Sequence, residues 1–128
     1  MSYYFNKIVD MTFNEAVDKV TEELKKEGFG VLTEIDVKAA LKKKINVDFR
    51  KYRILGACNP SFAHKALLAE DKIGTMLPCN IIVQEREDGK IEVAAIDPVA
   101  SMQSVKNENL GEIADKVQSK LKQVIENM

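Results

Sequence analysis

The dipeptide Asp88-Gly89 constrains the fold of this chain more than any other feature of its sequence. It separates two runs of strand-like composition, Cys79 to Glu87 and Lys90 to Ile96. Asp-Gly is a strong signal for a two-residue turn between paired strands, because such turns need positive φ angles at both central residues. The sequence therefore predicts at least one antiparallel pair of strands.

Further strands and helices are predicted on both sides of this hairpin. Strand-like runs cover residues 3–9, 29–35 and 52–58. Thr12 and Glu15 form a capping box, apolar residues follow at helical spacing, and Gly28 ends that helix. Other helices are expected from Asp36 to about 44, over 60–71, over 98–102 and over 110–127. The pattern predicts an α+β fold: a mainly antiparallel or mixed sheet of about five strands, covered by helices that include a long C-terminal one.

Composition and charge exclude several classes of protein. The chain has 128 residues, 45% of them hydrophobic and 30% charged, as expected for a single globular domain over residues 1–128. With 19 basic and 20 acidic residues, it has neither the basic footprint of a nucleic-acid binder nor a polybasic membrane surface. No apolar run reaches the roughly 20 residues of a membrane span, and the first residues do not resemble a secretory signal. We expect a cytoplasmic protein.

The common catalytic and cofactor motifs do not occur in the sequence. There is no G-x-S-x-G, no phosphate-binding glycine loop and no C-x-x-C motif. A single histidine, His64, cannot build a multi-histidine metal site. No cofactor can be named, and whether the protein is an enzyme stays open.

Two short segments that contain the cysteines stand out from this background. Cys58-Asn59-Pro60 ends a predicted strand and begins a helix, where free amides and the helix dipole favour a thiolate. Asn59 is a suitable N-cap and Pro60 is suited to the first helical position. Pro78-Cys79-Asn80 begins the next strand.

The distance between the two cysteines depends on the chain that joins them. The helix over 60–71 carries the chain away by roughly 18 Å. The linker over 72–78 can return by up to about 23 Å when it is extended. In that case Cys79 comes back beside Cys58, whereas a compact linker leaves the two thiols at opposite ends of parallel strands. Chain lengths alone leave both arrangements open.

Three functional interpretations follow. The chain can be a module that binds a small ligand or a soft metal such as Cu(I) or Zn, with Cys58, Cys79 and His64 as candidate metal ligands. It can instead be a thiol-based redox enzyme or sensor, in which Cys58 is the activated thiolate and Cys79 resolves the product. Thirdly, it can be a structural homodimer whose cysteines only pack. The apolar start Tyr3-Tyr4-Phe5 favours a homodimer in any of these cases.

The cysteine segments also resemble a known family. Gly56-Ala57-Cys58-Asn59-Pro60, an apolar helix, Leu77-Pro78-Cys79-Asn80, a hairpin and Asp97-Pro98 are similar to the small bacterial and archaeal family called domain of unknown function 302. The resemblance implies a compact α+β domain of the TATA-box-binding-protein-like fold class, a name that describes topology and not DNA binding. It also implies that the motif positions form one site. With His64, the candidate ligand-binding residues are Cys58, Asn59, Pro60, His64, Pro78, Cys79, Asn80 and Asp97.

Overall fold

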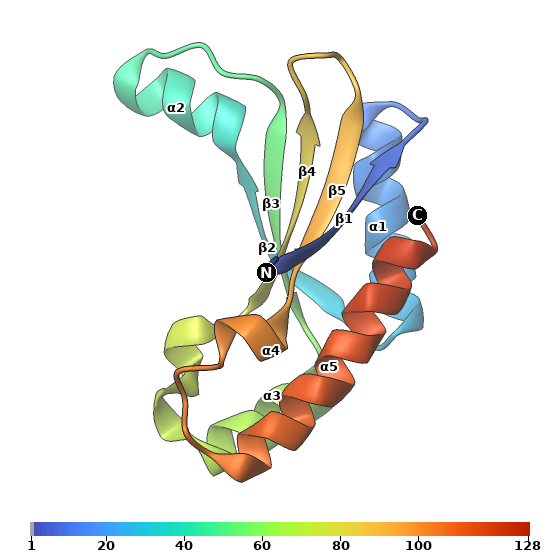
Figure 1. Ribbon diagram of the computed structural model, residues 1–128. Helices are drawn as coiled ribbons and strands as arrows, with labels where there is room; N and C mark the ends of the chain where they lie inside the picture. The colour runs from blue at the N-terminus through green and yellow to red at the C-terminus, as the bar shows by residue number, and fades with distance from the viewer. Residues whose placement is uncertain (1) are drawn as a thin grey trace.

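The computed structural model describes residues 2–128, and five strands within them form one fully antiparallel sheet (Figure 1). The order across the sheet is β1-β5-β4-β3-β2. The strands are β1 (Tyr4–Val9), β2 (Gly30–Asp36), β3 (Tyr52–Cys58), β4 (Cys79–Glu85) and β5 (Ile91–Ile96). The helices are α1 (Phe13–Lys26), α2 (Val37–Ile45), α3 (Pro60–Ala69), the 3-10 helix η1 (Asp71–Met76), α4 (Pro98–Ser101) and α5 (Glu108–Glu126). The predicted α+β class, the antiparallel sheet and the long closing helix are confirmed.

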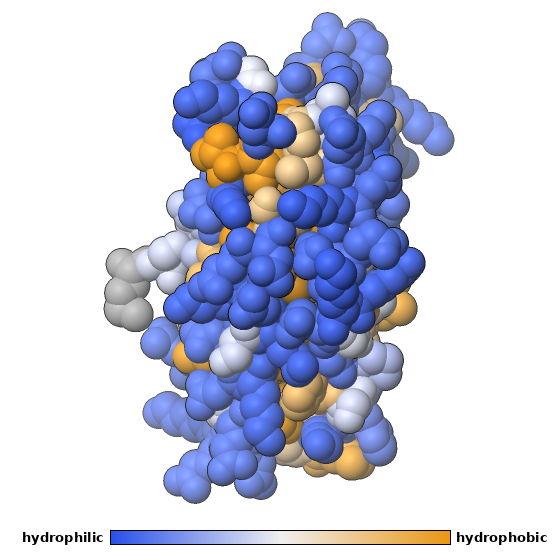
Figure 2. Space-filling view, turned by 90° about the vertical axis from the view of Figure 1, so that its right-hand side faces the viewer, coloured by the Kyte–Doolittle hydropathy of each residue, from blue (hydrophilic) through white to orange (hydrophobic). Residues whose placement is uncertain are grey.

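Helices α1 and α5 lie side by side on one face of the sheet (Figure 1). The capping box that begins α1 is formed: the Glu15 amide donates to Thr12 Oγ1 at 3.1 Å, and the Thr12 amide donates to Glu15 Oε1 at 3.0 Å. Figure 2 shows that hydrophilic residues dominate the outer face of this side of the molecule, with hydrophobic ones gathered near its two ends. Both helices are amphipathic and bury their apolar stripes against the sheet.

Strand alternation determines which side chains of the sheet face the helices and form the core. Ile81 and Val83 on β4 and Val93 on β5 point into it and are fully buried. Helical residues Leu24 and Leu121 meet them from the other side and are also fully buried. The residues between these positions on each strand point to the opposite face of the sheet, which carries no helix.

A second group of elements packs at one end of the sheet, where β3 ends and β4 begins. It consists of α3, η1 and α4, which close on the first half of α5 around buried Ala66, Ile73 and Leu110. The sequence predicts a helix to about residue 71 followed by a linker, but α3 ends at Ala69 and the 3-10 helix η1, which no local pattern predicts, follows it. Ile73, which is fully buried, fixes that turn against the body. Among residues 2–128, no helix is long and apolar enough to cross a membrane.

Candidate functional site

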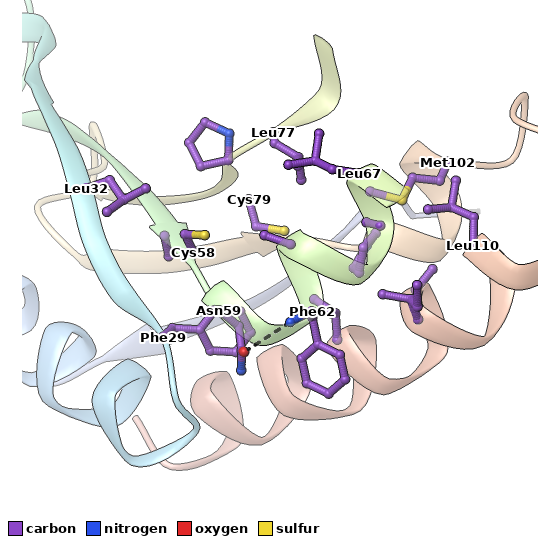
Figure 3. Close-up of a pocket in the computed structure, with 18 residues that line it drawn as sticks. Phe29, Leu32, Cys58, Asn59, Phe62, Leu67, Leu77, Cys79, Met102 and Leu110 are labelled. Carbon is purple, nitrogen blue, oxygen red and sulfur yellow. Dashed lines mark hydrogen bonds between the residues drawn. The ribbon is translucent and has the colours of Figure 1, made fainter. Parts of the chain in front are cut away.

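An apolar cavity of about 290 Å³ lies at this end of the sheet (Figure 3). Its walls come from the end of β3, the start of β4, and helices α3, α4 and α5. Most lining side chains are aliphatic or aromatic, and they include Phe29, Leu32, Phe62, Leu67, Leu77, Met102, Leu110 and Val117. Voids larger than a water molecule are few in a domain of this size, because protein interiors are close-packed. The cavity is therefore the first candidate for a ligand site.

Both cysteines line this cavity. Strands β3 and β4 are antiparallel neighbours, and the Cα of Ala57 pairs with the Cα of Cys79. Cys58, one residue later, thus lies at the same edge of the sheet as Cys79. In Figure 3 the two sulfur atoms are turned into the cavity from neighbouring positions on one wall. The structure has neither of the arrangements predicted from chain lengths: the linker is compact, since residues 71–76 form the 3-10 helix η1, yet the two cysteines lie at the same edge because β3 and β4 are antiparallel.

The two thiols have different surroundings. Cys79 is only 9% exposed, whereas Cys58 is partly exposed at the end of its strand. Burial raises the pKa of the Cys79 thiol from 9.0 to about 11, and the nearby charge of Cys58 adds to the effect. Cys79 is therefore a neutral thiol near pH 7. Of the pair, Cys58 is the one with access to solvent.

Asn59 and Pro78 complete the part of the predicted site that borders the cavity. Asn59 caps α3: its Oδ1 accepts from the Phe62 amide at 3.5 Å, and its Nδ2 donates to the Glu27 carbonyl at 3.4 Å. The cap therefore ties the start of α3 to the end of α1. Pro78 follows a cis peptide bond, and its ring lies over Gly56, where an added Cβ would come within 2.7 Å of Pro78 Cγ.

The other predicted site residues lie away from the cavity wall. Pro60 and His64 are exposed on α3, and neither borders the cavity. Asn80 follows Cys79 in β4, so strand alternation places it on the opposite, helix-free face. Asp97 caps α4 by accepting from the Val99 amide at 3.0 Å, and it also accepts from Gln118 Nε2 at 3.0 Å. Its neighbour Pro98 borders the cavity instead.

The apolar lining residues were not recognised as functional from the sequence. Phe62, Ala63, Ala66 and Leu67 form the apolar stripe of α3, and such a stripe indicates core packing. The sequence carries no local signal that α3 and α5 leave space between them. Within residues 2–128, no group of three or more His, Cys, Asp or Glu side chains could hold a metal ion. A metal at this site would have the two thiolates as its protein ligands.

Comparison with known proteins agrees with this architecture. The model of the family described as "Domain of unknown function DUF302" matches residues 5–128. The crystal structure of an uncharacterized conserved protein DUF302 from Bacillus stearothermophilus is similar to the chain, with 28% sequence identity and a TM-score of 0.91 over 98% of each chain. No curated protein matches the chain.

Proposed function

We propose that this chain, which belongs to the family described as domain of unknown function DUF302, binds a small ligand. The ligand is an apolar molecule, held in the cavity between α3, α5 and the edge of the sheet that carries the two cysteines. The observation that carries the proposal is the cavity itself, whose volume of about 290 Å³ lies close to the range of ligand pockets. Binding sites for small molecules are commonly apolar hollows with a few polar groups that fix orientation. Here the polar groups are the two thiols and the Asn59 amide.

The lining chemistry defines the class of ligand. Leu67, Leu77 and Met102 offer dispersion contacts and no charge. A charged ligand group would lose its hydration there without gaining an ionic partner, so binding it would be unfavourable. An uncharged, compact hydrophobic molecule that fills the cavity would occupy the volume of about ten water molecules, since each takes up about 30 Å³ in the liquid. It would lie against the Cys58 thiol.

The test is a titration with N-phenyl-1-naphthylamine, an uncharged apolar dye whose fluorescence rises in apolar surroundings. The wild type should bind the dye with a saturable signal. Ala63→Phe fills the cavity from α3 and should abolish that signal, because Ala63 is on the cavity wall. Leu68→Phe changes an exposed position of the same helix, outside the wall, and should bind like the wild type. Equal binding by all three proteins, or no saturable binding by the wild type, would rule the cavity out.

Thiol chemistry is a second candidate function, favoured by the two cysteines that line one cavity at the same edge of the sheet. With Cys58 as nucleophile and Cys79 as the resolving thiol, the pair could act as a redox sensor; as two soft donors it could instead hold Cu(I). Both roles need reduced thiols, which the cytoplasm maintains, and we propose that location. Stoichiometric retention of Cu(I) by the wild type, lost in both Cys58→Ser and Cys79→Ser, would support the metal role. The homodimer expected from the sequence is a separate proposal, which the helix-free face of the sheet supports.

A further inference from the structure

The face of the sheet that points away from α1 and α5 carries no helix in Figure 1, and part of it is apolar. Ile35, Ile54, Ile82 and Ala94 are register neighbours and form one row across four strands. Ile35 at the edge is 49% exposed. An antiparallel sheet that faces water on one side normally presents polar residues there, so an apolar row indicates a face that is covered in the working protein.

The polar side chains beside this row already bond to one another. Arg50 Nε donates to Gln84 Oε1 at 2.9 Å, and Gln84 Nε2 donates to Glu92 Oε1 at 2.8 Å. Asn6 Nδ2 donates to the other carboxylate oxygen of Glu92, also at 2.8 Å. Polar groups that are bonded within a network can be covered with a smaller desolvation cost than unpaired ones. The network therefore permits this face to be buried.

Helix α2 is the second unpartnered feature of the same region. It has nine residues and none of them is buried, and Ile45 in its last turn is 63% exposed. Figure 1 shows α2 standing off from the sheet beyond β2 and β3. Isolated helices shorter than about 12 residues are marginal in water, and helices of this length depend on packing for stability. The rest of its own chain supplies little packing to α2.

The open face contains a hollow of about 350 Å³ whose lining residues complement α2 in polarity and charge. Its floor includes Ile82 and Ala94, and Tyr4 and Tyr52 line it as well. Among the described residues that line the hollow, the charged one is Glu92, whereas α2 carries four lysines and no acidic residue. The apolar end of the helix suits the floor, and its positive charge complements the carboxylate.

We propose that the open face and α2 form a self-association surface, in which α2 of each copy docks in the hollow of a second copy. The proposal rests on the homodimer proposed above, for which it names the contact surface, and it does not depend on the ligand cavity, which lies at the end of the sheet. A two-fold axis pairs the protruding helix of each chain with the hollow of the other, as isologous dimers require. The flat footprint of the face is about 450 Å² at ordinary strand spacings. The docked helix adds a strip about 14 Å long and 10 Å wide. Together these areas amount to about 1,200 Å² over the two partners, which is the lower end of the range for stable interfaces.

The test uses two complementary charge variants and measures mass by sedimentation equilibrium. The wild type should be a dimer at tens of micromolar. Ile45→Glu places a charge on the helix and Ile82→Lys places the opposite charge in the hollow. Each variant alone should raise the dimer dissociation constant by about 100-fold or more, because it brings like charges together in both symmetric contacts: the glutamate at position 45 faces Glu92, and the lysine at position 82 faces the lysines of α2.

An equimolar mixture of the two variants should again form dimers. One of its contacts pairs Glu at position 45 with Lys at position 82, and the other contact is wild-type on both sides. Leu68→Glu is the matched control, since Leu68 is 75% exposed on α3, away from this surface, and its replacement should leave the mass unchanged. If Ile82→Lys unfolds by circular dichroism, Ala94→Lys takes its place in the same hollow. A monomeric wild type, dimeric single variants or a monomeric mixture would each overturn the proposal.

Discussion

The difference between the two thiols leads to a quantitative prediction about alkylation. The pKa of Cys79 is raised from 9.0 to about 11, first by burial and second by the charge of Cys58. At pH 7.5 this lowers the thiolate fraction of Cys79 from about 1 in 30 to about 1 in 3,000, and the thiolate is the reactive form. A thiolate of higher pKa is also more nucleophilic, which offsets roughly tenfold of this loss, so we expect Cys79 in the folded protein to react about 10-fold more slowly than in the unfolded chain, and also more slowly than Cys58.

Timed iodoacetamide labelling with peptide mass mapping measures both rates. It is applied to the wild type, Cys58→Ser and Cys79→Ser, with protein unfolded in urea as the reference. The Cys79 rate should rise about tenfold per pH unit and level off only near pH 11. Restricted access alone would lower the rate at every pH without moving the level-off point, so the profile separates the two causes. In Cys58→Ser the profile should move to slightly lower pH, because the smaller of the two causes is gone while burial remains.

Equal rates for the two cysteines in the folded protein at neutral pH would refute this reasoning. A Cys79 rate that levels off below pH 9 would refute it as well. Absence of labelling at both positions even at pH 10 would show that both thiols are closed off from solvent, which favours simple packing.

Three further predictions concern stability, each measured by urea unfolding unless stated. Leu121→Ala should lower the free energy of unfolding by about 3–5 kcal/mol, because Leu121 is fully buried, and Val117→Ala should lower it by about 1–3 kcal/mol. Losses below about 0.5 kcal/mol for both variants would show that this stripe of α5 is not part of the core. Gly56→Ala should cost about 1–3 kcal/mol, because its Cβ would overlap Thr33 Oγ1 and the Pro78 ring, whereas Gly30→Ala meets no atom within 4 Å and should differ by less than about 1 kcal/mol. The pKa of the Cys79 thiol is higher in the folded protein than in the unfolded chain. The free energy of unfolding therefore includes the full contribution of this thiol below pH 9, and it falls by about 3 kcal/mol as the pH rises through about 11. Lysines and tyrosines titrate in the same range, so Cys79→Ala should make the alkaline decline in thermal melting smaller without abolishing it; an unchanged decline would contradict the prediction.

Local signals in the sequence predicted most of the secondary structure. The capping pair Thr12 and Glu15 and the Asn59-Pro60 step each begin a helix where expected. Asp88-Gly89 lies in the turn that joins β4 and β5, so the predicted antiparallel pair is present. The predicted two-residue turn is wrong: of the two residues only Gly89 has a positive φ, +83°, and the Arg86 amide donates to the Lys90 carbonyl at 2.8 Å across a three-residue loop. These signals act within a few residues, because a cap or a turn is stabilised by hydrogen bonds to its immediate neighbours. The prediction was wrong at η1, where burial of Ile73 by distant elements stabilises a turn that its own residues do not indicate.

The sequence by itself therefore determined the caps, the hairpin, the amphipathic faces and the α+β class. Only the tertiary structure decided how the candidate site is assembled. Antiparallel pairing of β3 with β4 brings Cys58 beside Cys79, while strand alternation turns Asn80 to the other face of the sheet. The cavity exists because α3 and α5 pack against the sheet edge without filling the space between them. Pairing and unfilled volume depend on residues far apart along the chain, so no local pattern encodes them.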